Sequence, residues 1–133
     1  MTIEFKPIGY VKTSIDKMPR HWTVSDVEGE LIIDGQYREG LKDIKPGTKI
    51  VVLFHFHKSQ PFDSNFLRRK PPHHKEIKGV FSICSPVRPN PIGLSVLDVL
   101  DIKDTTIHVK GLDMINDTPV LDIKPHITGM EED

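Results

Sequence analysis

Prolines and glycines constrain this sequence more than any other feature, because they divide it into short segments. Eleven prolines and nine glycines are spread over 133 residues. Proline removes a backbone N–H and glycine leaves the backbone unrestricted, so both interrupt helices. Long amphipathic helices therefore have little room, and the short apolar runs between turn residues are typical of strands.

The clearest predicted strand covers residues 48–57, in which Ile50 begins an almost continuous apolar run that ends at Phe56. Such a run is expected of a strand buried on both faces. Residues 102–107 have the pattern of a hairpin turn that returns the chain as a partner strand. The predicted strands are residues 5–13, 27–33, 48–57, 80–84, 94–102, 107–112 and 120–123.

One short helix is predicted over residues 35–44, with Leu41 and Ile44 toward the core and Gly47 in the turn that follows. Residues 58–78 show neither a helical nor a strand period. They are predicted to form one long loop, and such loops in compact domains are usually functional or disordered. The chain is therefore predicted to be all-β, a barrel or sandwich with one short helix and a long loop, in a single domain over residues 1–133.

The charges of the chain nearly balance, since 18 lysines and arginines meet 19 aspartates and glutamates for a net charge of -1. This balance excludes a uniformly basic nucleic-acid binder but allows a local basic patch. The long loop contains such a patch in Arg68, Arg69, Lys70 and Lys75. The alternative interpretation is that these side chains form an ordinary solvated face.

Several features point to a cytoplasmic protein that does not associate with membranes. The N-terminal sequence has an early acid, Glu4, and no apolar stretch, so it does not have the pattern of a secretory signal. No apolar run is long enough to span a bilayer. Cys84 is the only cysteine, which excludes an intramolecular disulfide.

The densest group of candidate functional residues lies in the string SPVRPNPIG (residues 85–93). Its prolines restrict the backbone, so Arg88 and Asn90 are held at set positions and lose little entropy when they bind a ligand. The arginine fork suits phosphate or carboxylate, and the asparagine amide suits a nucleobase edge. An equally good interpretation is a structural turn, in which Arg88 pairs with a carboxylate and Asn90 caps backbone groups.

Two other groups of polar residues are candidates for chemistry. Asp113, Asp117 and Asp122 lie close together in the sequence. Paired carboxylates can serve in acid–base catalysis, but nearby acids more often cap turns. His55 and His57 would lie on one face of a strand, as in some metal-binding barrels. No further ligand pair has a convincing spacing, so no metal site is predicted.

Motifs of several common enzyme classes are absent from the sequence. It has no P-loop, no GxGxxG dinucleotide motif, no GxSxG elbow and no CxxC pair. Nucleotide hydrolysis, hydride transfer and serine hydrolase chemistry therefore lack their usual signals.

Four strings together resemble one known family. They are IGYV (residues 8–11), LFHFH (53–57), RPNPIG (88–93) and DTPVLDIKP (117–125). The last two are long and specific, and the likeness runs over nearly the whole chain. On these strings the sequence resembles the TrmO-like family, also called the TsaA-like domain.

This resemblance implies a compact antiparallel β-barrel that works as a homodimer and holds S-adenosylmethionine near the subunit boundary. Family members methylate the exocyclic amine of threonylcarbamoyl-adenosine, which lies next to the anticodon of tRNA. By resemblance, Arg88 and Asn90 face the reaction site and are catalytic. From its local charge, the basic patch of the long loop is expected to bind the RNA backbone. The residues that the resemblance places against the cofactor are Pro19, Arg20, His21, His57, Lys58, Leu94, Gly111, Leu112 and Asp113.

The sequence also departs from the family pattern. Many members have an arginine where this chain has Cys84 and a tyrosine where it has His126. Longer members carry a C-terminal domain that helps with the substrate. These differences leave two alternatives: methyl transfer to another RNA or to a small molecule, and a non-catalytic barrel that binds single-stranded RNA by stacking and charge.

Overall fold

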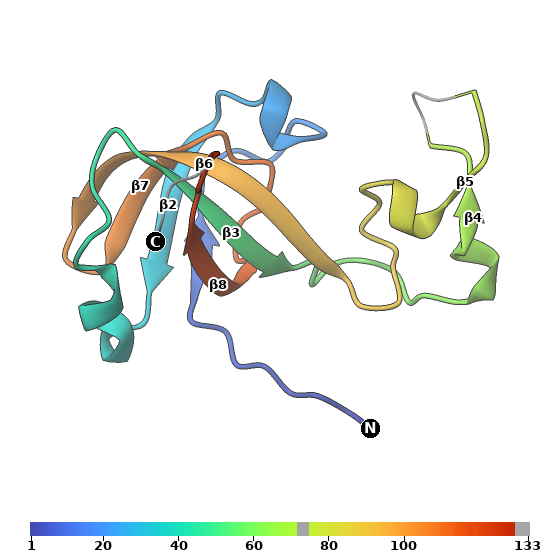
Figure 1. Ribbon diagram of the computed structural model, residues 1–133, viewed down its shortest axis with the longest axis horizontal. Helices are drawn as coiled ribbons and strands as arrows, with labels where there is room; N and C mark the ends of the chain where they lie inside the picture. Colours follow the sequence, from blue (N-terminus) through green and yellow to red (C-terminus); the bar gives the residue numbers. More distant parts are fainter. Residues whose placement is uncertain (72–74, 130–133) are drawn as a thin grey trace.

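Six antiparallel strands close into a barrel in the computed structural model of the protein, which describes residues 1–71 and 75–129 (Figure 1). Around the barrel the strand order is β1-β2-β7-β6-β3-β8. The strands are β1 Gly9–Lys12, β2 Glu28–Ile33, β3 Lys49–His55, β6 Ile92–Lys103, β7 Thr106–Lys110 and β8 Pro119–Pro125. The all-β prediction is confirmed, and the barrel is the architecture that the family resemblance implied.

The alternation of side chains along each strand lets the barrel close around a single core. In β3, Ile50, Val52 and Phe54 are buried, whereas Val51 and Leu53 on the outer face are only half-buried. An antiparallel barrel strand needs one face on the core. The prediction that this strand is buried on both faces is therefore wrong, and the continuous apolar run instead leaves apolar side chains on the outside of the barrel.

The helical segments are short 3₁₀ helices: η1 Trp22–Val24, η2 Gly35–Leu41, η3 Ser64–Phe66 and η4 Val80–Ser82. The predicted helix over residues 35–44 corresponds to η2, and its Leu41 packs into the core as predicted. The strand predicted over residues 80–84 is wrong, because η4 stands there and Phe81 is almost fully exposed. No helix in the described part of the chain is long and apolar enough to cross a membrane.

The pairing of β3 with β6 sets the geometry of the candidate site. It runs from Lys49 opposite Asp98 to His55 opposite Ile92. The chain between these strands therefore leaves and re-enters the barrel at the same end. The backbone N–H of Phe56 donates to the carbonyl of Pro91 at 2.8 Å, which closes this excursion at its base. The string at residues 85–93 is consequently held beside residues 54–57.

The excursion between β3 and β6 forms a lobe that stands away from the barrel (Figure 1). We define the lobe as residues 60–71 and 75–84. It contains η3, η4 and a small antiparallel sheet of β4 Arg68–Arg69 and β5 Lys78–Gly79. The predicted long loop over residues 58–78 is thus partly folded on itself. Residues 72–74 of that loop and residues 130–133 lie outside the described part of the chain.

Candidate active site

A cavity of about 210 Å³ lies where the lobe meets the barrel, and we call it the barrel-end cavity. Three segments contribute to it: the end of β3 with the turn that follows, the proline-rich string, and the loop between β7 and β8. Its lining residues are Phe54, Phe56, His57, Lys58, Ser59, Pro86, Asp113, Met114, Ile115 and Thr118. Apolar walls with a few convergent polar groups are typical of ligand sites.

Two phenylalanines form one wall of the barrel-end cavity. The rings of Phe54 and Phe56 meet edge to face, with centroids 5.0 Å apart and an interplanar angle of 75°. Gly93, opposite Phe54 on β6, makes this packing possible, since a Cβ atom there would overlap both rings. A residue without a side chain is therefore required at this point of the RPNPIG string.

Asp113 brings a partly buried carboxyl group to the same cavity. The hydroxyl of Ser95 donates to its Oδ1 at 2.6 Å. Burial raises the pKa of the Asp113 carboxyl, while the Ser95 hydrogen bond, the nearby His21 ring and the backbone N–H of Trp22 oppose that rise. His21 is the N-cap of η1 and Trp22 is its first residue, so the start of η1 lies near this carboxyl group. His21 and Asp113, which lie far apart in the sequence, are thus brought together.

His57 supplies a polar atom without a partner. Its Nε2 is buried and has no hydrogen-bond partner among the described residues. Buried polar atoms in native proteins are nearly always hydrogen-bonded, and an unpaired one costs about 1–3 kcal/mol. His57 also lines the barrel-end cavity, so a residue with an unsatisfied polar atom belongs to the wall of this cavity.

The two predicted catalytic residues lie on the turn between the lobe and β6. One Nη of Arg88 donates to the carbonyl of Ile83 at 2.7 Å and to that of Ser85 at 3.3 Å. Arg88 therefore pairs with backbone carbonyls, and no carboxylate among the described residues pairs with it, although the interpretation as a structural turn expected one. Asn90 is exposed and lines a separate groove of about 640 Å³, together with His55 and the N-terminal residues. Since Pro86 lines the barrel-end cavity, this turn borders both spaces.

Several residues expected against the cofactor lie outside the barrel-end cavity. Leu94 is 52% exposed on the outer face of β6, whereas its neighbour Ser95 is buried. Leu112 is fully buried in the barrel core, so only its backbone is available. Gly111 is buried, with a φ of +103. Pro19 and Arg20 lie in the loop that leads into η1.

The two histidines of the LFHFH string do not share a face. Strand β3 ends at His55, and the backbone N–H of His57 turns back to the carbonyl of His55 at 2.8 Å. His57 lines the barrel-end cavity, whereas His55 lines the groove beside Asn90. No group of three or more potential metal ligands occurs among residues 1–71 and 75–129.

Sequence reasoning missed Ser95 and Thr118. Both are buried polar residues: Ser95 binds Asp113, and the Thr118 hydroxyl donates to the carbonyl of Ile115 at 2.7 Å. A signal for Ser95 was present, because it is the one hydroxyl among the inward positions of β6, which otherwise hold Gly93, Leu97 and Val99.

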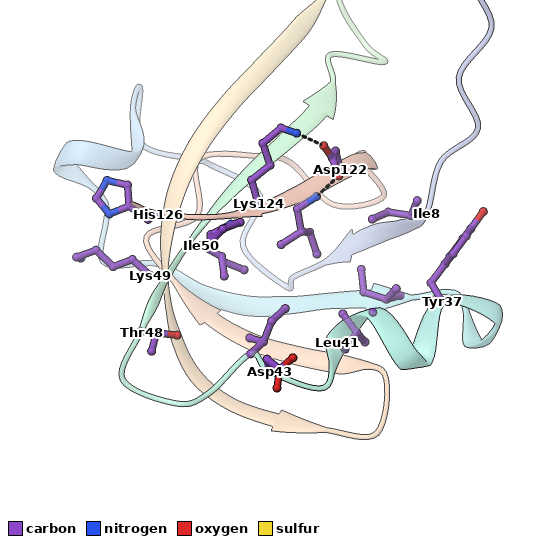
Figure 2. Close-up of a pocket in the computed structure, with 15 residues that line it drawn as sticks. Ile8, Tyr37, Leu41, Asp43, Thr48, Lys49, Ile50, Asp122, Lys124 and His126 are labelled. Atoms are coloured by element: carbon purple, nitrogen blue, oxygen red, sulfur yellow. Dashed lines mark hydrogen bonds and ion pairs between the residues drawn. The ribbon is translucent and has the colours of Figure 1, made fainter. Parts of the chain in front are cut away.

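A larger cavity, of about 640 Å³, lies toward the other end of β3 (Figure 2). Its floor is aliphatic and includes Ile8, Leu41 and Ile50, and the ion pair of Asp122 with Lys124 lies at its rim (Figure 2). None of the predicted catalytic or cofactor residues lines it. The residues named from the sequence therefore favour the smaller cavity at the opposite end of β3.

The fold and site together define a class of small closed antiparallel barrels, with a lobe inserted between two paired strands and a cavity at the base of the lobe. The family model described as the tRNA-methyltransferase O N-terminal domain matches residues 11–132. The chain therefore belongs to the TrmO family, as the four strings of its sequence indicate.

Known relatives agree with this assignment. A probable S-adenosyl-L-methionine-binding protein of Pyrococcus abyssi is 33% identical over 96% of this chain and 70% of its own length. An S-adenosyl-L-methionine-binding protein of Archaeoglobus fulgidus is 38% identical over 91% of this chain and 87% of its own. The human tRNA (adenine(37)-N6)-methyltransferase is 38% identical over 65% of this chain but only 20% of its own length.

Solved structures show the same fold. The crystal structure of TrmO from Pseudomonas aeruginosa superposes with a TM-score of 0.75 at 28% identity and covers 96% of this chain. The present chain spans 57% of that solved chain, so the known protein contains substantial further sequence.

Proposed function

We propose that the chain binds S-adenosylmethionine, with part of the cofactor in the barrel-end cavity. The observation that carries this proposal is that one cavity is lined both by Asp113 and by His57, whose Nε2 is buried without a partner among the described residues. The names of the Pyrococcus and Archaeoglobus relatives support it. The cavity is smaller than the roughly 300–1,000 Å³ typical of ligand pockets, so the remainder of the cofactor would extend toward His21 and Trp22.

The polar groups of the cavity suit the hydroxyl and ammonium groups of this cofactor. Asp113 accepts hydrogen bonds, and the Ser95 hydroxyl fixes the orientation of its carboxylate. A carboxylate placed next to the sulfonium would stabilise the reactant more than the transition state. We therefore assign Asp113 to binding the ribose or the amino acid part. The bound cofactor would supply an activated methyl group for transfer.

We further propose that the methyl acceptor is the exocyclic amine of threonylcarbamoyl-adenosine next to the anticodon of tRNA. The human relative named tRNA (adenine(37)-N6)-methyltransferase supports an acceptor of this class. The turn that carries Arg88 and Asn90 borders both the barrel-end cavity and the groove of about 640 Å³. The target base would lie in the groove at Asn90, in line with the methyl group.

Arg88 would lower the barrier by stabilising negative charge. An amine bonded to both an adenine ring and a carbonyl loses its proton more readily than a simple amine. A fixed guanidinium near the carbonyl oxygen would stabilise the charge that develops there. The Ile83 and Ser85 carbonyls hold one Nη of Arg88 and keep the side chain ordered. Its remaining N–H groups can serve the substrate.

The lobe would contact the tRNA backbone. Arg68, Lys70 and Lys75 are exposed on it, together with two exposed acidic residues, Asp63 and Glu76. The lobe stands away from the barrel (Figure 1), and Ser59 and Pro86 at its base line the barrel-end cavity. RNA bound along the lobe would therefore pass the proposed reaction site. A cytoplasmic location follows from a tRNA substrate.

We propose that the active form is a homodimer. The outer face of β3 and β6 carries Ile92 and Leu94, which are 42% and 52% exposed, beside half-buried Leu53. Contiguous exposed apolar side chains of this kind mark interaction surfaces. Sedimentation of a Leu94→Glu variant as a monomer, against a wild-type dimer, tests this arrangement.

In a second candidate function, the protein also uses S-adenosylmethionine, but the methyl group is transferred to another RNA or to a small molecule. Two observations favour it. Cys84 is exposed where many family members have an arginine, and the archaeal relatives carry names that specify cofactor binding without an acceptor. A non-catalytic RNA-binding barrel would lack affinity for the cofactor altogether.

The direct experiment is transfer of a labelled methyl group from S-adenosylmethionine to tRNA that carries threonylcarbamoyl-adenosine. Arg88→Ala is expected to slow transfer about 10²- to 10³-fold, the usual effect of removing one charge-stabilising donor. Arg38→Ala, whose exposed ion pair with Asp104 lies elsewhere on the barrel, is the matched control. Equal transfer to tRNA without the modification supports the second candidate, and cofactor binding without any transfer contradicts the enzymatic proposal.

A further inference from the structure

Among the basic residues of the lobe, Arg69 differs from its neighbours. Arg68 and Lys70 are exposed, whereas Arg69 is half-buried. Its Nη1 donates to the hydroxyl of Ser85 at 2.6 Å, and its guanidinium lies over the ring of Phe66, 5.3 Å from the centroid. Both contacts are directed into the protein, so Arg69 is not presented to the RNA as its neighbours are.

Ser85, the partner of Arg69, makes several hydrogen bonds in the turn that holds Arg88. The Ser85 hydroxyl also accepts the backbone N–H of Val87 at 3.2 Å. The Ser85 carbonyl, together with that of Ile83, accepts the Arg88 guanidinium. One serine thus receives Arg69 on its side chain and Arg88 on its backbone. Movement of Ser85 would displace the carbonyl groups that orient Arg88.

The lobe supplies a rigid base for this chain of contacts. Arg69 belongs to β4, which pairs with β5, and the backbone N–H of Val80 donates to the Leu67 carbonyl at 2.8 Å. On the other side of the turn, the Ser59 hydroxyl donates to the carbonyl of Pro86 at 3.1 Å. Residues 83–88 are therefore fixed from the lobe and from the segment that follows His57 in the barrel-end cavity.

We propose that Arg69 is a positioning residue for Arg88 and that it acts through Ser85 without contacting RNA. The proposal rests on the function assigned above, in which Arg88 stabilises charge during methyl transfer. Arginine suits the role because its planar group stacks on Phe66 while it donates to Ser85, which a lysine ammonium does with less directional control. Reacting groups displaced by about 1 Å can slow a reaction about 10²-fold.

The positioning role and an RNA contact predict opposite kinetic effects. We expect Arg69→Ala to lower kcat about 10- to 100-fold at saturating tRNA, with the KM for tRNA and the salt dependence of tRNA binding unchanged. Arg68→Ala, one residue away, is expected to weaken tRNA binding and to reduce the salt slope by about 0.7. Arg69→Lys retains one donor and is expected to recover part of the lost kcat.

A double-variant cycle tests the route through Ser85. Ser85→Ala removes the hydroxyl that Arg69 binds, so it is expected to lower kcat by a similar factor. The Arg69→Ala, Ser85→Ala double variant should then be no slower than the slower single variant, since both changes break one chain of contacts. Multiplied effects would show that the two residues act independently and would overturn the proposal.

A readout without any substrate separates this proposal from the proposed function. The amide of Val87, which donates to Ser85, is expected to exchange its hydrogen faster in Arg69→Ala than in wild type, and to be unchanged in Arg68→Ala. Faster exchange in Arg69→Ala, together with a wild-type protein that transfers no methyl group, would refute the enzymatic function and keep the positioning role. A smaller salt slope with unchanged kcat and exchange would make Arg69 an RNA contact and refute the proposal.

Discussion

At the scale of single residues, the candidate site contains polar groups whose burial costs folding free energy unless a ligand binds them. Asp113 is held partly buried with a raised pKa, and the Nε2 of His57 is buried without a partner among the described residues. Both features cost folding free energy and are tolerated where a ligand satisfies them. Functional sites are where such perturbed groups gather.

The Asp113→Asn variant separates binding from stability. An amide can keep the Ser95 hydrogen bond but removes the buried charge, so S-adenosylmethionine affinity is expected to fall about 10- to 100-fold, the effect of losing one hydrogen bond to a charged group. The free energy of unfolding at neutral pH is expected to rise or stay unchanged. Calorimetric titration and urea unfolding measure the two quantities.

The raised pKa of Asp113 also sets the sign of a pH dependence. Between its ordinary value of 3.8 and the raised folded-state pKa, the native protein binds more protons at this group than the unfolded chain does. The contribution of Asp113 to the free energy of unfolding therefore falls as the pH rises through this window. The stability difference between Asp113→Asn and wild type should grow with pH there. A difference that shrinks would contradict the assigned environment.

At the scale of elements, the close contact of β6 with β3 shapes the cavity wall. We expect Gly93→Ala to lower the free energy of unfolding by about 1–3 kcal/mol, because the added methyl group overlaps Phe54 and Phe56. Cofactor affinity should fall as well, since both rings line the cavity. Gly40→Ala is the control, because its Cβ would meet no atom within 4 Å. Equal melting temperatures for the two variants would show that the rings move aside freely.

The lobe is the element assigned to RNA. Replacing Arg68, Lys70 and Lys75 with alanine is expected to reduce the slope of log affinity against log salt by about two, from roughly 0.7 for each lost phosphate contact on single strands. Cofactor affinity should not change. Lys42, Lys45 and Lys103, on the η2 side of the barrel, provide a matched triple variant. An unchanged slope in the lobe variant would identify an ordinary solvated face.

At the scale of the whole molecule, local patterns predicted the strands better than the connections between them. Alternation and turn residues located the barrel strands, but within residues 80–84 the chain forms the 3₁₀ helix η4 at Val80–Ser82 instead of a strand. The prediction that β3 is buried on both faces is wrong, because in a closed barrel only one face of each strand packs against the core.

The candidate site was predictable where its residues lie in specific strings and not where it depends on pairing across the barrel. His57 and Asp113 were named from the sequence, and they line one cavity. Ser95 was missed because its role depends on Asp113, 18 positions away. Leu112 and Leu94 were named by resemblance, yet one lies in the core and the other on the outer face. Whether such a side chain faces the core or the solvent depends on the register of the strand pairing, which the sequence does not show.

The central claim, that the barrel-end cavity binds S-adenosylmethionine, is tested most directly by titration calorimetry of wild type, His57→Leu and His55→Leu. We expect wild type and His55→Leu to bind the cofactor with equal affinity, because His55 lies outside the cavity. His57→Leu should bind at least about tenfold more weakly, a loss of about 1.4 kcal/mol, with undiminished thermal stability. Equal affinities for all three proteins, or no binding to wild type, would contradict the account.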